Sequence, residues 1–337
     1  MNKSLLALIF STVLFFGGGE LAARLFLSHS NDALDLTRGV LIADEQLLWK
    51  NAPRLDTQFL GFPLLTDTRG WRIGRDRGSD AGTYRVLILG PSSTFGWGVA
   101  HEDTYSHALQ ALIPQSAVIN AGEIGYSSAQ GVRLATDGVL REIQPQVTVL
   151  AYGINDLDRY RFFFQSTRDD RDEFAQMHAS SSVFVMNALR RSAFVYLLAK
   201  ISSVMILGHV SGEAVQRVSV DTFIENERAL IHKATSVGSH VVIMTTTTYY
   251  APTVTGRTSD GRDRATEVAR ITEGVERMNA RLRILSDEES VPLLDIDQVF
   301  GERDRKALFV DPIHFSKEGN ALVAEALSRI IEAWRAK

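Results

Sequence analysis

From residue 84 to its end, this chain alternates short apolar, β-branched runs with longer amphipathic helical patterns. Five of these runs are predicted strands, at residues 84–89, 117–120, 147–152, 240–246 and 291–296. Helical patterns lie between them, at about 104–112, 127–143, 222–237 and 266–286. Strands that alternate with helices are typical of a parallel sheet with helices packed on both faces. We therefore expect an α/β fold with a five-stranded parallel sheet in three layers.

The last segment of the chain shows the clearest helical period. Apolar side chains recur there at three- and four-residue steps, at Leu322, Val323, Ala326, Leu327, Ile330, Ile331 and Trp334. The pattern predicts an amphipathic helix that buries one stripe against the sheet, and Ser316 is its candidate N-cap.

Four polar blocks occupy the ends of these elements. They are GPSSTFGWGV at 90–99, NAGEIG at 120–125, GIND at 153–156 and DPIH at 311–314. The first three directly follow predicted strands, and the fourth precedes the last predicted helix. Parallel strands end at the same edge of a sheet, and open α/β sheets bind their ligands at that edge. One cleft is therefore expected to hold all four blocks.

In their order and placement, the blocks resemble those of the SGNH (GDSL-type) hydrolases. The resemblance runs from about residue 85 to the C-terminus, and TDTRGWR at 66–72 resembles the extension that precedes this domain in membrane-anchored bacterial members. It implies a flavodoxin-like three-layer fold and a serine esterase. Matched position by position, it implies a catalytic triad of Ser92, Asp311 and His314. It also implies an oxyanion hole formed by Ser92, Gly122 and Asn155.

These residue types suit acyl transfer. A serine hydroxyl needs a base, and a carboxylate must hold that base in one tautomer. With an Asp three residues before a His, a turn can bring the carboxylate to Nδ1 while Nε2 faces the serine. The oxyanion that forms on attack needs preorganised donors. Taken singly, Gly122 could only make a turn and Asn155 could only cap one, but four blocks in order favour the catalytic roles.

One residue departs from the family pattern. Pro91 replaces the usual Asp before the nucleophile, so the block reads GPS instead of GDS. Proline has no N–H and a fixed φ, which could reshape the nucleophile loop. The remaining S-x-T-x-G-x-G register, from Ser92 to Gly98, still favours Ser92 over Ser93 as the nucleophile.

The expected function is hydrolysis of ester-linked acyl groups, with O-acetylated glycans as candidate substrates. Two alternatives stay open: an O-acetyltransferase that uses the same triad on a cell-envelope polysaccharide, and a catalytically weak pseudoenzyme that binds glycan. Trp97, Tyr126 and Tyr249 are candidates for a sugar-binding wall, and packing near strand ends explains them equally well.

The N-terminus predicts a membrane anchor. Lys3 precedes an uncharged run over residues 4–19, and the apolar element continues to Leu27, about the length that spans a bilayer. Because no A-x-A-like cleavage site follows, we expect a single-pass signal anchor at 1–27 in a bacterial inner membrane, with the catalytic domain in the periplasm. The alternative is a cleaved signal peptide and a secreted protein.

The sequence divides the rest of the chain into two parts. Residues 28–83 are expected to form a membrane-proximal extension that packs loosely on the catalytic domain. Residues 84–337 are expected to form the hydrolase domain, with a lid-like insertion at about 157–220. The apolar part of this insertion could be a second span, but Lys200 lies within it and favours a lid or substrate-wall helix.

Composition excludes several other classes. The net charge of −4 and the lack of a long Lys/Arg block argue against nucleic-acid binding. The chain has no Cys, and the glycines at 17–19 lack the Lys-Ser/Thr of a phosphate loop. Neither a cofactor nor a metal is expected, and the sequence does not indicate whether the chain has a protein partner. The acidic residues of the insertion are interpreted as a solvated loop: Asp156, Asp158, Asp169 and Asp170.

Overall fold

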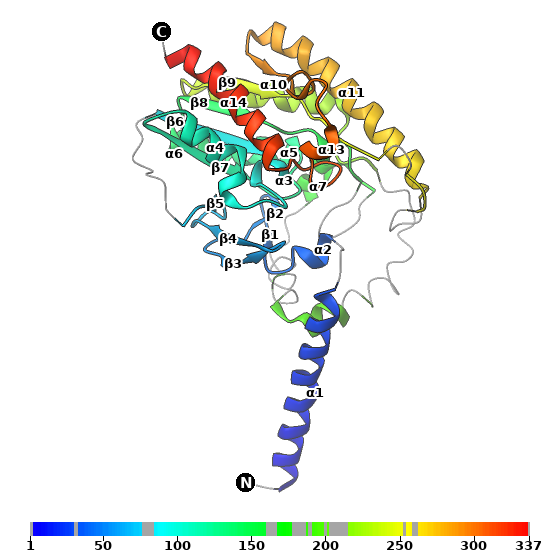
Figure 1. The fold of residues 1–337 in the computed structure, drawn as a ribbon. Coiled ribbons are helices and arrows are strands. Elements are labelled where there is room, and N and C mark those ends of the chain that lie inside the picture. The colour runs from blue at the N-terminus through cyan, green and yellow to red at the C-terminus, as the bar shows by residue number, and fades with distance from the viewer. Residues whose placement is uncertain are drawn as a thin grey trace.

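The computed structural model describes residues 3–29, 33–75, 84–159, 167–176, 187, 191–198, 201, 215–251, 254–257 and 262–335. At its centre is a five-stranded parallel sheet (Figure 1). Its strands are β6 (Tyr84–Gly90), β7 (Ser116–Gly122), β8 (Val147–Leu150), β9 (His240–Met244) and β10 (Leu293–Leu294). They lie in the order β10-β9-β8-β6-β7, which is the flavodoxin-like order. The predicted α/β fold is confirmed.

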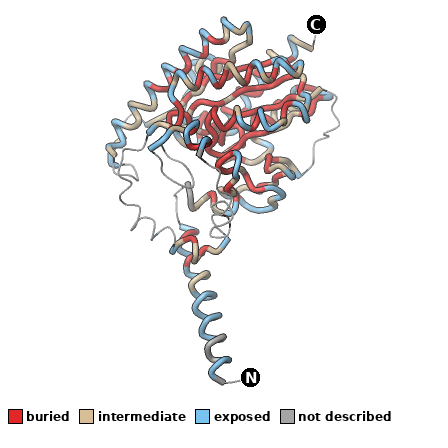
Figure 2. The backbone as a smooth tube through the Cα atoms, turned by 180° about the vertical axis from the view of Figure 1, so that it is seen from behind, coloured by how far each residue is buried: buried red, intermediate tan, exposed pale blue. Residues whose placement is uncertain are grey.

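Helices cover both faces of the sheet (Figures 1 and 2). One face carries α4 (Tyr105–Leu112), α12 (Ile296–Phe300), α13 (Arg305–Leu308) and α14 (Lys317–Arg335). The other face carries α5 (Ser128–Thr136), α6 (Val139–Ile143), α10 (Val220–Ser236) and α11 (Arg264–Glu289). Strand β6 contributes to the hydrophobic core on both faces of the sheet. Ile88 packs in the core beneath α14, and Leu89 packs in the core beneath α10. Alternate side chains of a strand point to opposite faces, so a sheet buried on both sides needs apolar residues throughout.

The helices differ from the sequence prediction in several places: α12 and α13 were not predicted, and α12 begins at Ile296, inside the strand predicted over 291–296. The helix expected over 127–143 is divided into α5 and α6, because Gly138 between them has φ +99°. Glycine reaches this left-handed conformation without steric cost, so the chain can end one helix and start another there. As predicted, Ser316 precedes α14, and its hydroxyl accepts a hydrogen bond from the Gly319 N–H at 3.3 Å.

The extension before the α/β domain is folded. It contains α2 (Ala33–Leu36), β1 (Leu41–Asp44), β2 (Leu48–Asn51), β3 (Asp56–Phe59), β4 (Phe62–Thr66) and β5 (Arg72–Ile73). The strands form two small antiparallel sheets, β1–β2 and β3–β4–β5. The expectation of loose packing is wrong: Trp49 is fully buried and its indole N–H donates to the Ile124 carbonyl at 2.8 Å. Strands of two to five residues are too short to show a period in the sequence.

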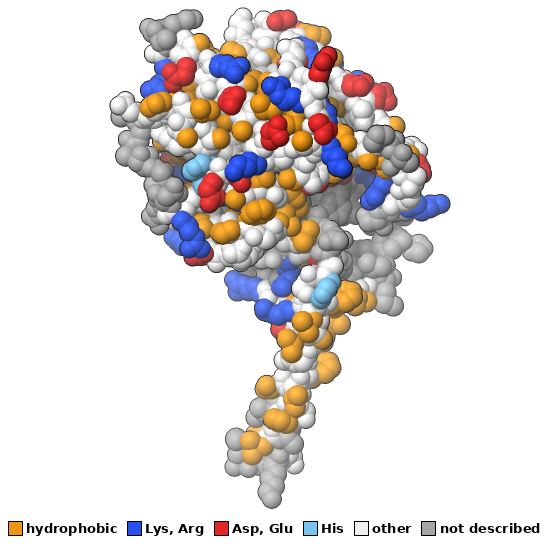
Figure 3. Space-filling model, in the orientation of Figure 1, with side chains coloured by type: hydrophobic (Ala, Val, Ile, Leu, Met, Phe, Trp, Pro, Cys, Tyr) orange, Lys and Arg blue, Asp and Glu red, His pale blue; other side chains and the backbone are white. Residues whose placement is uncertain are grey.

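Helix α1 (Lys3–Leu27) projects away from the domain (Figure 1), and apolar side chains cover its surface (Figure 3). Within the described part of the chain, it alone is long and apolar enough to cross a membrane, over Ser4–Leu27, a property that signal sequences share. Near its end, the Glu20 carboxylate accepts hydrogen bonds from the Ser192 hydroxyl and the N–H groups of Ala193 and Phe194, at 2.8 to 3.1 Å. These donors belong to the start of the helical residues 193–198.

Only parts of the insertion at 157–220 are described. They include α7 (Asp170–Gln176) and the helical residues 193–198. The considered second span falls largely outside the described residues, and the lid role stays a prediction.

Candidate active site

The four polar blocks meet where the strand order reverses. Strand β6 pairs with β7 on one side and with β8 on the other, which makes the carboxyl ends of β6 and β8 the topological switch point. Ser92 begins α3 (Ser92–Phe95) directly after β6. Asn155 lies in the short helix η2 (Ile154–Asp156) after β8. The loop before α14 brings Asp311 and His314 to the same edge.

Ser92, His314 and Asp311 form a continuous hydrogen-bonded chain. The Ser92 Oγ lies 2.7 Å from His314 Nε2, although the two residues are 222 positions apart. On the other side of the ring, His314 Nδ1 lies 2.7 Å from Asp311 Oδ2. Ser92 and His314 are buried, whereas the Asp311 side chain is one-third exposed. With its Nδ1 proton held by Asp311, the imidazole can accept a proton from the serine at Nε2.

The second oxygen of Asp311 is held by the main chain. Its Oδ1 accepts the N–H groups of Ile313 and His314, each at 3.0 Å. Burial by itself would raise the pKa of Asp311, but the hydrogen bonds and charge of His314, helped by these two N–H groups, hold its pKa below the ordinary value. The carboxylate therefore remains ionised beside the imidazole at neutral pH.

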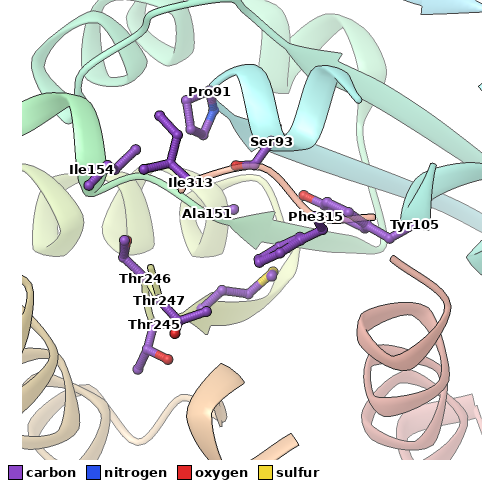
Figure 4. Close-up of a pocket in the computed structure, with 11 residues that line it drawn as sticks. Pro91, Ser93, Tyr105, Ala151, Ile154, Thr245, Thr246, Thr247, Ile313 and Phe315 are labelled. Carbon is purple, nitrogen blue, oxygen red and sulfur yellow. The ribbon is translucent and has the colours of Figure 1, made fainter. Parts of the chain in front are cut away.

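Pro91 is accommodated at the N-cap of α3. Its φ is −89° and its carbonyl accepts the Phe95 N–H at 3.0 Å. The residue before a helix needs no helical hydrogen bond from its own N–H, so proline interrupts nothing here. Ser93, the next residue after Ser92, lines a pocket beside Pro91 (Figure 4), whereas the hydroxyl of Ser92 is the one hydrogen-bonded to His314.

Gly122 has a packing role in the structure, which differs from the oxyanion role that we expected. Its N–H donates to Asn120 Oδ1 at 3.0 Å, and a Cβ at this position would lie 2.2 Å from the Phe95 backbone nitrogen. Glycine is thus required for α3 to approach β7, while its N–H is already hydrogen-bonded. The oxyanion role predicted for Gly122 does not fit this arrangement.

A second glycine of the same block has an open donor. Gly125 has φ +77°, and among the described residues no acceptor takes its N–H. The Asn155 side-chain amide donates one hydrogen to the carbonyl of Tyr126 at 3.0 Å, which brings it against this turn. Its second amide hydrogen stays available. The Ser92 N–H, in the first turn of α3, likewise has no acceptor among the described residues.

The three aromatic candidates have different surroundings. Trp97 stacks on the His314 ring, with centroids 5.2 Å apart and planes 16° from parallel. Tyr249 is tied to the same loop, because its N–H donates to the Pro312 carbonyl at 2.8 Å. Tyr126 is fully buried and its hydroxyl donates to the Trp49 carbonyl at 2.7 Å. It therefore packs beneath the extension and cannot line a substrate wall.

The acidic residues around the insertion are not a solvated loop as a group. Asp156 is fully buried and accepts the Ser128 N–H and hydroxyl, and Asp170 is fully buried against Arg217 at 2.8 Å. Burial raises the pKa of Asp156 to about 7, against the lowering effect of the Ser128 hydrogen bonds. Among the described residues, no group of three or more His, Cys, Asp or Glu side chains could hold a metal ion.

Sequence reasoning missed several residues near the site. Tyr250 follows Tyr249, and burial together with the charges of Asp158 and Asp311 raises its pKa to about 12, so its hydroxyl stays protonated. Arg72 and Phe59 reach the loop after Ser92 from the extension. Tyr250 could have been found from the sequence, because it directly follows the candidate Tyr249. For Phe59 and Arg72, only the placement of Arg72 in the TDTRGWR segment pointed toward the site.

Comparison with known proteins gives one family and several similar folds. Residues 88–322 match the model of the GDSL-like lipase/acylhydrolase family. A GDSL-like lipase from Bacteroides thetaiotaomicron is 15% identical, with 74% of this chain and 88% of that chain covered and a TM-score of 0.45. A lipase/acylhydrolase from Enterococcus faecalis is 20% identical, with 74% and 96% covered and a TM-score of 0.45. An acetyl xylan esterase is 19% identical, with 73% and 99% covered and a TM-score of 0.43. No curated protein sequence matches the chain.

Proposed function

This chain belongs to the GDSL-like lipase/acylhydrolase family, and from this we propose that it is a serine esterase that hydrolyses ester-linked acyl groups. The observation that carries the proposal is the hydrogen-bonded chain from Ser92 through His314 to Asp311 at the switch point of the sheet. A nucleophile, a base and an orienting carboxylate in this geometry are the parts that acyl transfer through serine requires.

In the proposed reaction, Ser92 Oγ attacks the ester carbonyl as His314 Nε2 takes its proton. Asp311 stabilises the imidazolium that forms. Collapse of the tetrahedral intermediate breaks the ester C–O bond, and His314 returns the proton to the leaving alcohol. Water then attacks the acyl-serine with His314 as the base, releasing the carboxylic acid and restoring Ser92.

We place the oxyanion against three donors. They are the N–H of Ser92, the free amide hydrogen of Asn155 and the N–H of Gly125, which replaces Gly122 in this role. The support is that Asn155 is hydrogen-bonded to the carbonyl next to Gly125, and that the N–H groups of Ser92 and Gly125 have no acceptor among the described residues. Removing one such donor typically costs about 3 kcal/mol of barrier stabilisation.

The proposed substrates carry short acyl groups, with O-acetylated glycans as candidates. A narrow pocket borders the nucleophile turn, with Pro91, Ile154 and Ile313 on one side (Figure 4). Its other lining includes Met244, Thr245, Thr246 and Thr247. Ser93 lines this pocket and neither Ser92 nor His314 does, so we do not assign it to the acyl group. Trp97 and Tyr249 flank the loop of His314 and are placed to contact a sugar ring.

A panel of nitrophenyl esters, from acetyl to palmitoyl, tests this assignment on the purified full chain. We expect the highest kcat/KM with acetyl and a fall of about tenfold or more by octanoyl. Each methylene that the acyl site cannot hold lowers kcat/KM for the longer ester. Ser92→Ala is the background control. A preference for long chains would contradict the short-acyl assignment.

The same panel separates the two alternatives. Adding an oligosaccharide acceptor should leave the rate of acid release unchanged for a hydrolase. Acid release that falls while acetylated oligosaccharide accumulates would identify an O-acetyltransferase instead. Neither turnover nor labelling by a fluorophosphonate probe, together with measurable glycan binding, would identify a pseudoenzyme.

We further propose that α1 is an uncleaved anchor in a bacterial inner membrane and that the catalytic domain lies in the periplasm. The supports are the length and apolar surface of α1 and the positive Lys3 at its start. A C-terminal alkaline phosphatase fusion should be active, whereas a C-terminal fusion to a reporter that works only in the cytoplasm should be silent. A soluble mature protein that begins after residue 20 would show that the segment is a cleaved signal.

A further inference from the structure

Arg72 links the extension to the turn that carries Ser92. Its side chain is 4% exposed, and its guanidinium donates to the carbonyls of Gly96 at 2.6 Å, Val99 at 2.9 Å and Phe95 at 3.2 Å. It also lies over the Phe95 ring, 5.3 Å from its centroid. The Phe95 carbonyl is at the last residue of α3, and the other two belong to the segment that directly follows it.

This position is costly for a cation. The acceptors of Arg72 are main-chain carbonyls that carry no net charge, and among the described residues its Nε is buried without a partner. Burial lowers the pKa of Arg72 to about 10, against the opposing effect of the Glu102 charge. Removing a charge from water without a counter-ion is unfavourable. What the side chain supplies is geometry, because the planar guanidinium fixes several acceptors in one arrangement.

Phe59 makes a second link from the same small sheet. Its ring meets the Trp97 ring edge to face at 5.0 Å and the Phe95 ring at 6.2 Å. Trp97 in turn stacks on His314. Phe59 is in β3 and Arg72 is in β5, so the β3–β4–β5 sheet contacts both the main chain and the aromatic ring of the 95–99 segment.

We propose that Arg72 is a positioning residue of the catalytic centre: it fixes the 95–99 segment so that Trp97 holds the His314 ring toward Ser92. The extension is thereby part of the active-site framework. This inference rests on the proposed function of Ser92 and His314. Without Arg72, the buried carbonyls of Phe95 and Val99 lose their donor, Gly96 keeps only the Val99 N–H at 3.5 Å, and the segment must shift to satisfy them. The first consequence is loss of the parallel stack on His314.

The test compares Arg72→Ala with Arg75→Ala on the full chain. Arg75 is a matched control, because it lies at the end of the same sheet with 71% of its side chain exposed. A displacement of about 1 Å can cost on the order of a hundredfold in rate, so we expect Arg72→Ala to lower kcat about that much while KM stays unchanged. Guanidinium chloride, far below unfolding concentrations, should restore at least about tenfold of that loss in Arg72→Ala and should not accelerate the wild type.

A spectroscopic readout makes the test independent of turnover. Protonated imidazole quenches the fluorescence of an indole that it contacts, so Trp97 should report the stack as His314 is titrated. Trp334 stacks on His240 in the same way, and the measurement therefore uses a Trp334→Phe background. Arg72→Ala should lose the pH-dependent quenching of Trp97, and guanidinium should restore it. Trp97→Phe assigns the signal.

The outcomes distinguish this inference from the proposed function. A folded Arg72→Ala variant with wild-type kcat and wild-type quenching would overturn the positioning role. If the alanine variant does not fold, Arg72→Lys keeps the charge but loses the planar geometry, and it should keep the wild-type Tm with reduced kcat and weakened quenching. A Lys variant equal to wild type in both would equally overturn it. An inert wild type whose quenching still depends on Arg72 would refute the esterase and support the positioning.

Discussion

Ser92→Ala should abolish ester turnover and labelling by a fluorophosphonate probe in a protein that still folds. The substitution removes the hydroxyl oxygen that lies 2.7 Å from His314 Nε2, and alanine fits the first turn of α3 without strain. Loss of the nucleophile in a serine hydrolase costs on the order of 10⁶ in kcat, so even a weak wild type should fall to background. Labelling followed by intact mass measures the loss directly.

Ser93→Ala is the matched control for this result. Ser93 is adjacent in sequence and has the same hydroxyl, but it faces the pocket beside Pro91. The variant should label at the wild-type rate and keep its activity on acetyl esters. Persistent labelling in Ser92→Ala, together with its loss in Ser93→Ala, would move the nucleophile to Ser93 and invalidate the proposed triad.

Asp311→Asn should lower kcat by about 10⁴ with little effect on stability. The reason lies in the two N–H groups that Asp311 Oδ1 accepts. In the variant, these donors will hold the amide oxygen, which leaves the NH₂ group facing His314 Nδ1. An NH₂ group needs an acceptor, so the imidazole must place its proton on Nε2. In that tautomer it cannot take the Ser92 proton.

Steady-state kinetics on an acetyl ester measure this effect. Glu302→Gln makes the same carboxylate-to-amide change at an exposed residue and should leave kcat unaltered. The ¹⁵N chemical shifts of the His314 ring in Asp311→Asn, measured by NMR, should show the proton on Nε2. Activity close to wild type would mean that His314 keeps its working tautomer without a carboxylate.

The sequence predicted the sheet from local patterns, and it predicted the hydrogen-bonded chain of Ser92, His314 and Asp311 from the resemblance of the polar blocks to a known family. Strands such as β6 are continuous apolar runs, and Ser92 and His314 lie directly beside the ends of regular elements. Gly122 shows where local pattern fails. Two glycines lie three residues apart in NAGEIG, and only the hydrogen bond from Gly122 to Asn120 shows which N–H is left open.

The contributions of the extension were not predictable in the same way. Arg72 contacts carbonyls 23 to 27 positions away, and carbonyls carry no side-chain signature in a sequence. Asp156 and Asp170 were misjudged for a related reason: an acidic run looks solvated unless the partner is known, and Arg217 lies 47 residues beyond Asp170. The substrate-wall role predicted for Tyr126 was wrong because its partner, Trp49 in β2, is 77 residues away and its contact could not be read from the sequence.

For an enzyme anchored by α1, the folded extension also sets how far the active site can reach. Only residues 28–40 separate the end of α1 from the first strand, and even fully extended they would span about 45 Å. Because β1 to β5 are packed against the rest of the domain, the residues after 40 add no further length to this connection. Under the proposed anchoring, the active site therefore stays close to the bilayer, and we expect it to meet substrate in that layer at an effective concentration that a freely diffusing form would not have.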